Sequence, residues 1–119
     1  EEYPNSIFIL QNIKGFINKS TTNYSYHEIN HALALRLMNE KINNELIASL
    51  NEALEREAGQ NNFRLVFALG VILENEVLAI DVIPHMDIEE LRDIYQSEMP
   101  IKKLFSNKIN ATIENTIGD

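Results

Sequence analysis

Residues 25–59 read SYHEINHALALRLMNEKINNELIASLNEALEREAG, and this stretch decides the fold that the sequence predicts. Ser25 and Glu28 have the spacing of a capping box, in which both side chains bond free backbone N–H groups at a helix start. Gly59 suits the left-handed residue that often follows a helix. The apolar residues between these ends recur at three- and four-residue steps, at Leu35, Met38, Ile42, Leu46, Leu50 and Ala53. The stretch therefore predicts a long amphipathic helix.

The predicted helix is long for a chain of this size. About 33 residues at ~1.5 Å each span roughly 50 Å, whereas a compact domain with a radius of gyration of about 13–14 Å is roughly 35 Å across. The helix either breaks, at Asn43 and Asn44, or its overhang is covered by a partner. Because the apolar stripe keeps its phase across Asn43 and Asn44, we expect a continuous helix that serves as a dimer or partner surface.

The remaining segments predict a small sheet and one further helix. Residues 63–73 (FRLVFALGVIL) and 77–84 (VLAIDVIP) are apolar runs around a polar tip, which is typical of a β-hairpin. Residues 6–17 and 108–117 predict additional strands, the latter from the alternation of Ile109, Ala111 and Ile113. Asp87 can cap a short helix over residues 87–95. The expected fold is α+β: a single domain, 1–119, with the long helix packed on a mainly antiparallel sheet.

Composition limits the partners that we expect. The formal net charge is −8, which does not favour phosphate binding, so we predict no nucleic-acid partner. No uncharged run is long enough to span a bilayer, and we expect no membrane association and a cytoplasmic location. The chain has no cysteine, which excludes disulfides and thiolate metal sites.

Residues 27–31 (HEINH) match the H-E-x-x-H pattern of zinc peptidases. In that reading His27 and His31 bind zinc, Glu28 acts as the base, and Glu52 is the third ligand. Glu52 would lie roughly 30 Å from the histidines along a straight helix, at ~1.5 Å per residue, so the metal site requires the helix to fold back. We favour a continuous helix, and therefore predict no metal and no cofactor.

The half of the chain from Arg64 onward resembles the chorismate-lyase-like superfamily, which includes chorismate pyruvate-lyases and the UTRA effector-binding domains of transcription regulators. The resemblance lies in a predicted strand opening with Arg64, a hairpin, an acidic helix, and the pair Pro100–Ile101 before a last strand. It implies that Arg64 binds a ligand carboxylate and that Pro100, Ile101 and Lys102 lie beside the ligand. Lys102 stands where the family has a glycine, and the family's catalytic glutamate has no counterpart here.

These observations predict a non-catalytic binding module, either a small-molecule-sensing or a protein-interaction domain, that forms a homodimer or binds a protein partner through the long helix. One alternative is an acidic inhibitor or immunity-type protein that covers a basic partner, with Asp87, Glu89, Glu90 and Asp93 as the acidic face. The other alternative is a zinc-dependent hydrolase that uses the HEINH motif.

Overall fold

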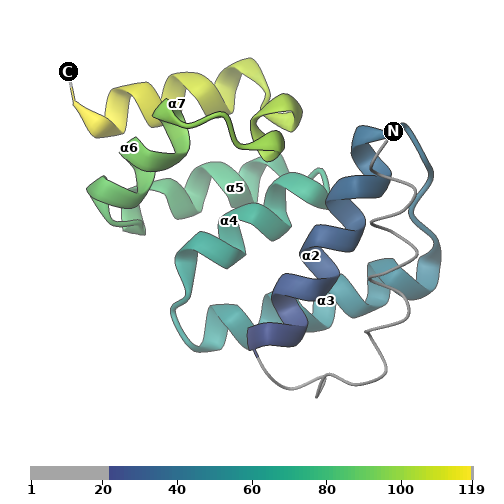
Figure 1. Cartoon of the computed structure of the whole chain (residues 1–119). Helices are drawn as coiled ribbons and strands as arrows, with labels where there is room; N and C mark the ends of the chain where they lie inside the picture. The colour runs from purple at the N-terminus through teal and green to yellow at the C-terminus, as the bar shows by residue number, and fades with distance from the viewer. Residues whose placement is uncertain (1–21, 119) are drawn as a thin grey trace.

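The computed structural model describes residues 22–118, and its regular secondary structure over these residues is entirely helical (Figure 1). The α-helices are α2 (Thr22–Leu37), α3 (Asn44–Gly59), α4 (Phe63–Ile72), α5 (Glu76–Val82), α6 (Ile88–Gln96) and α7 (Asn107–Ile117). Two short 3₁₀ helices, η1 (Ile83–His85) and η2 (Pro100–Leu104), follow α5 and α6. The predicted α+β fold is wrong, because no strand occurs in residues 22–118. The strand predicted at residues 6–17 lies outside the described residues.

The long helix predicted over residues 25–59 is two helices that fold back on each other. α2 ends at Leu37, and α3 begins after its N-cap Asn43, whose side chain accepts a hydrogen bond from Leu46 N at 2.7 Å. The prediction of a continuous helix is therefore wrong: the helix breaks, as the sequence also allowed, but the break covers residues 38–43 and Asn44 is the first residue of α3. Ser25 is not an N-cap, because α2 already begins at Thr22.

Three helices end in the same way, on a non-glycine residue with left-handed backbone. Asn39, Asn61 and Glu74 follow α2, α3 and α4 with φ angles of 60°, 57° and 61°. In each case the next residue donates its N–H to a carbonyl five positions back, as in Asn62 N to Glu57 O at 3.0 Å. This is the Schellman motif, which bonds otherwise free carbonyl groups at a helix end. Asn39, Asn61 and Glu74 are therefore helix stops, and Asn61 takes the left-handed position that was predicted for Gly59.

α4 lies where the first strand of the β-hairpin was predicted, from the apolar run of residues 63–73 before a polar tip. Leu65, Val66, Phe67, Leu69 and Val71 are all buried, so the helix is enclosed on most sides. A helix in such a position needs no polar face, and periodicity alone cannot distinguish it from a buried strand. Gly70 lets α5 approach closely, since a Cβ there would lie 3.2 Å from the backbone nitrogen of Ala79.

α6 confirms the short helix predicted at residues 87–95, with the Asp87 side chain accepting from Glu89 N at 3.1 Å. α7 replaces the strand predicted at residues 108–117. Its buried residues are Ile109 and Ile113, four apart, while Ala111 between them is exposed. The real period is thus that of a helix, with Ser106 as N-cap.

The helices pack around α4, which contacts α2, α3, α5 and both 3₁₀ helices. Figure 1 shows α2 and α3 side by side, α4 and α5 in the middle, and α6 and α7 on the side away from α3. One apolar core joins residues from every helix between residues 22 and 118, including Leu50, Phe67, Leu91 and Ile113. This arrangement leaves α2 with two distinct contact faces, one on α3 and one beside α4 and η2.

Candidate functional site

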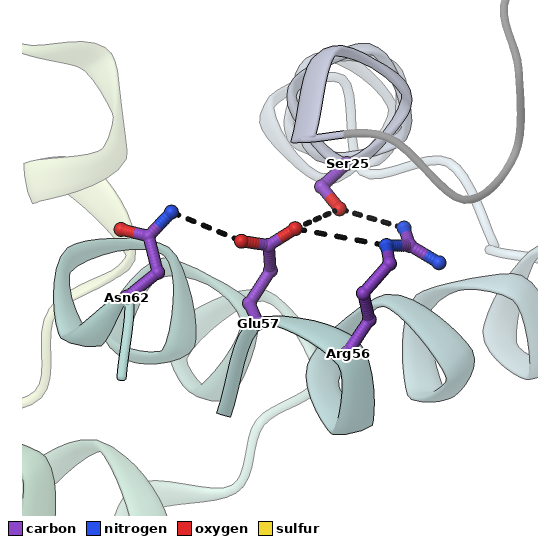
Figure 2. A network of polar contacts seen from close by, with 4 residues as sticks. All are labelled: Ser25, Arg56, Glu57 and Asn62. Atoms are coloured by element: carbon purple, nitrogen blue, oxygen red, sulfur yellow. Dashed lines mark hydrogen bonds and ion pairs between the residues drawn. The ribbon is translucent and has the colours of Figure 1, made fainter. Parts of the chain in front are cut away.

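The first candidate is a buried polar network where the start of α2 meets the end of α3. The Ser25 hydroxyl donates to Glu57 Oε2 at 2.7 Å, and Asn62 Nδ2 donates to Glu57 Oε1 at 2.9 Å (Figure 2). Arg56 Nη2 donates to the Ser25 oxygen at 2.7 Å, and Arg56 Nε lies 3.7 Å from Glu57 Oε2. We call these four residues the hairpin junction, because they connect α2, α3 and the turn into α4.

The hairpin junction is suited to holding helices together rather than to catalysis. Ser25 and Glu57 have no solvent exposure, so a substrate has no direct access to the hydroxyl. The serine donates its proton to a carboxylate and accepts a bond from a guanidinium, which does not resemble the serine–histidine pair of a nucleophilic hydrolase. Both carboxylate oxygens of Glu57 accept hydrogen bonds, as a buried charge requires. None of the predicted site residues belongs to this network.

The HEINH motif lies on α2, and its three functional side chains are buried. His27, Glu28 and His31 each have at most a few per cent of their surface exposed. The fold-back that the zinc hypothesis requires is present, because α3 runs alongside α2. Glu52, however, is exposed on α3. Among residues 22–118, no three His, Asp or Glu side chains are grouped so that they could hold a metal ion. The described residues therefore supply no third ligand for this motif.

The second candidate is an apolar groove of about 140 Å³, which we call the Arg64 groove. One wall is α2, which contributes Tyr26, Ile29, Asn30 and Leu33. These positions recur at three- and four-residue steps, which places them along one side of the helix. Tyr26 is 48% exposed although it is a large aromatic residue. This wall forms a second stripe on α2, separate from the predicted apolar stripe that begins at Leu35.

The opposite wall and the floor come from distant parts of the chain. α4 contributes Arg64, Phe67 and Ala68, while the segment after α6 contributes Met99 and Ile101. Two of the four predicted ligand-binding residues, Arg64 and Ile101, thus lie on one groove. Sequence reasoning missed Tyr26, Ala68 and Met99. Only the spacing along α2 could have indicated Tyr26, and only tertiary packing brings the other two together.

The Arg64 side chain is only lightly restrained. Its Nη2 lies 3.9 Å from Asp93 Oδ2, with side-chain exposures of 35% for Arg64 and 65% for Asp93. Exposed ion pairs of this kind contribute about 0–1 kcal/mol. Among the described residues that line the groove, Arg64 alone carries a positive charge.

The other two predicted ligand-binding residues have different surroundings. Lys102 donates from Nζ to the carbonyl oxygens of Tyr95 at 2.5 Å and Ser97 at 3.0 Å, so its ammonium group caps the end of α6. Pro100 is exposed at the first position of η2. Neither lines the Arg64 groove. Their predicted role beside a ligand stays a prediction.

A larger hollow of about 570 Å³ lies between the α2–α3 turn and the end of α4, beside Arg36, Lys41 and Glu74. The Arg36 guanidinium donates to Ile72 O and to Glu74 Oε2, both at 3.0 Å, and so closes the end of α4. The volume lies within the range of small-ligand pockets, roughly 300–1,000 Å³. Arg36 pairs with Glu74, and Glu40 and Lys41 also line the hollow with opposite charges, so its lining has no net charge with which to select a ligand.

Within residues 22–118, no helix has the length and apolar content needed to cross a bilayer. Comparison of the chain with protein-family models, with curated proteins and with solved structures finds no match. The strands on which the resemblance to the chorismate-lyase-like superfamily was based are helices in the structure, and the comparisons provide no independent test of that resemblance.

Proposed function

We propose that this chain is a non-catalytic protein-interaction module that holds an apolar side chain of a partner protein in the Arg64 groove. The observation that carries the proposal is the combination of the open apolar groove with the exposed Tyr26 at its wall. An exposed aromatic side chain at the edge of an apolar groove offers the contact surface that a partner side chain can cover.

The size of the groove favours a side chain over a small-molecule ligand. Its volume of about 140 Å³ is below the roughly 300–1,000 Å³ of pockets that enclose drug-sized ligands. Interfaces are enriched in tyrosine, methionine and arginine, and the groove has one of each in Tyr26, Met99 and Arg64. The flexible thioether of Met99 can adapt to different apolar groups. Small-molecule sensing and the cytoplasmic location stay predictions.

Two earlier predictions about partners have less support. The dimer was expected to form through a continuous helix, but that helix is divided into α2 and α3. The homodimer stays a prediction, and the long helix no longer supports it. The acidic face expected on α6 is mixed in charge, because Arg92 lies among its acidic residues, and Lys102 and Lys103 follow in η2. The four acidic residues still outnumber Arg92, and the acidic docking face stays a prediction.

A selection from a displayed library of helical peptides would test the proposal. The library is enriched on the wild-type chain alone, and the selected peptides are then measured on Ala68→Phe, which fills the groove, and on Asn30→Trp, which blocks its exposed edge. Ala111→Phe, on the exposed face of α7, is the matched control. We expect peptides with apolar anchors that bind wild type and the control but neither groove variant. Circular dichroism establishes that each variant is folded. If the selected peptides bind all four chains equally, the proposal is wrong.

A further inference from the structure

Of the arginines between residues 22 and 118, Arg92 is exposed on α6 and does not line the groove, and the other three differ in how their guanidinium donors are used. Arg36 donates to Ile72 O and to Glu74, and Arg56 donates to Ser25, all at 3.0 Å or less. Arg64 has an ion pair with Asp93 at 3.9 Å, and no hydrogen bond joins its guanidinium to another residue between 22 and 118. A guanidinium has five N–H donors in a fixed fork that matches a carboxylate. Arg64 therefore has donors available at the groove.

The present partner of Arg64 is easily replaced. Asp93 is more exposed than Arg64, and their separation is at the long end of the range for an ion pair. Pairs of this kind are weak because water solvates both charges. A second carboxylate held over the groove would be nearer to apolar side chains such as Ile94 and Ile101, where water is excluded and the same charges attract more strongly. Exchange of Asp93 for such a carboxylate is thus favourable if a partner supplies it.

The shape of the groove limits what can supply that carboxylate. The α2 wall extends from Tyr26 to Leu33, which is about 10 Å, or two helical turns, at ~1.5 Å per residue. Helices bind in such grooves through anchor side chains spaced by three or four residues. Asn62 and Ser25 both donate hydrogen bonds to Glu57, which places Asn62 near the start of α2. Arg64 follows Asn62 by two residues and is therefore close to the Tyr26 end of this wall. An acidic residue one turn from an apolar anchor would reach it.

We infer that the segment bound in the Arg64 groove is an amphipathic helix that places an apolar side chain between α2 and α4 and an aspartate or glutamate on Arg64, in exchange for Asp93. This inference rests on the proposed function. The net charge of −8 opposes a strongly acidic partner. The acidic residue is therefore a single contact within a face that is otherwise apolar or basic, and it provides specificity more than affinity.

Three synthetic helical peptides test the inference on the full chain. They share two leucines four residues apart and differ at one position, a turn from the first leucine, which is Glu, Gln or Lys. Binding is located by ¹H–¹⁵N chemical-shift changes and measured by calorimetry. We expect the Glu peptide to bind about five-fold more tightly than the Gln peptide. Arg64→Gln should remove that preference, while Asp93→Asn should strengthen binding of the Glu peptide and leave the Gln peptide unchanged.

The outcomes separate the inference from the proposed function. If Gln and Glu peptides bind the groove equally, the carboxylate contact is wrong and the interaction module stands. Tighter binding of the Lys peptide also overturns the inference, because it means that the acidic residues of α6 select the partner. If none of the peptides shifts the resonances of Tyr26, Leu33 and Ala68, both proposals are wrong. Arg92→Gln, on the exposed part of α6, is the control that should leave all three affinities unchanged.

Discussion

Helix α2 carries two contacts that satisfy their polar groups in different ways. At the hairpin junction, the fully buried Ser25 and Glu57 bond each other, and the partly exposed Arg56 donates to Ser25. At the Arg64 groove, the same helix presents Tyr26 to a hollow whose charged residue is held by one long ion pair. A dense polar cluster is therefore not in itself a functional site. The sparser region has the unused binding capacity, and the denser one holds the fold together.

Among the substitutions considered, Glu57→Ala at the hairpin junction should lower the stability of the fold the most. It removes the acceptor of both Ser25 and Asn62 and leaves Arg56 beside a cavity. Loss of one partner from a buried charged network costs several kcal/mol, so we expect unfolding to become about 3 kcal/mol easier. Urea denaturation measures the change. Glu55→Ala, on the exposed face of the same helix, should alter stability by less than about 0.5 kcal/mol. Equal effects of the two variants would contradict a structural role for the junction.

Ser25→Ala should have a smaller effect, because the carboxylate of Glu57 remains with Asn62 and Arg56. We expect a loss of about 1–2 kcal/mol, since one buried oxygen loses its donor and the guanidinium loses an acceptor. Ser49→Ala on α3 is the matched control, and it should be neutral or slightly stabilising because alanine has the higher helix propensity. A double variant with Glu57→Ala that costs no more than Glu57→Ala alone would show that the hydroxyl acts only through the carboxylate.

The hairpin illustrates which parts of the fold the sequence could predict. Local capping chemistry was predicted correctly at α6, where Asp87 bonds the backbone two residues later, whereas the capping box expected at Ser25 is wrong and the cap at Asn43 was not predicted. The period of α7 was misread because Ile109 and Ile113 fit both a two-residue and a four-residue spacing, and only the exposure of Ala111 distinguishes them. α4 could not be assigned at all from its pattern, since burial on most sides removes the polar face that gives a helix its period.

For the candidate sites, too, some residues were predicted from the sequence and others were not. Arg64 and Ile101 were predicted near a ligand, and they do line one groove, although the strands that motivated their choice are helices. The groove itself depends on Met99 lying against α2 and α4, a contact between positions more than 30 residues apart in the sequence. Ser25 and Glu57 are similarly joined across 32 residues. Helix periodicity relates only residues that are three or four positions apart, so it could not predict contacts between residues of different helices.

Asn43→Ala tests the turn between α2 and α3, at the opposite end of the helix pair from the hairpin junction. The Asn43 side chain caps α3 through Leu46 N at 2.7 Å, in a partly exposed position. Replacing an N-cap asparagine by alanine costs about 1 kcal/mol. Asn44→Ala, one residue later and already inside the helix, should be neutral or stabilising. Thermal or urea denaturation of both variants measures the difference, and a loss for Asn44→Ala as large as that for Asn43→Ala would mean that the break is not stabilised by this cap.

The smallest expected effects on stability come from the groove, and they complete the contrast with the junction. Arg64→Gln and Asp93→Asn each break an ion pair 3.9 Å long between partly exposed side chains. We expect each to change the free energy of unfolding by less than about 0.5 kcal/mol, because water replaces the lost partner. The double variant should equal either single variant within error. Urea denaturation in low and high salt makes the test strict, since any residual attraction is screened at high salt. A loss comparable to that of Ser25→Ala would mean that Arg64 holds the fold, and its donors would then no longer be available to a partner. A negligible loss, together with altered peptide binding, would separate binding from stability at one residue.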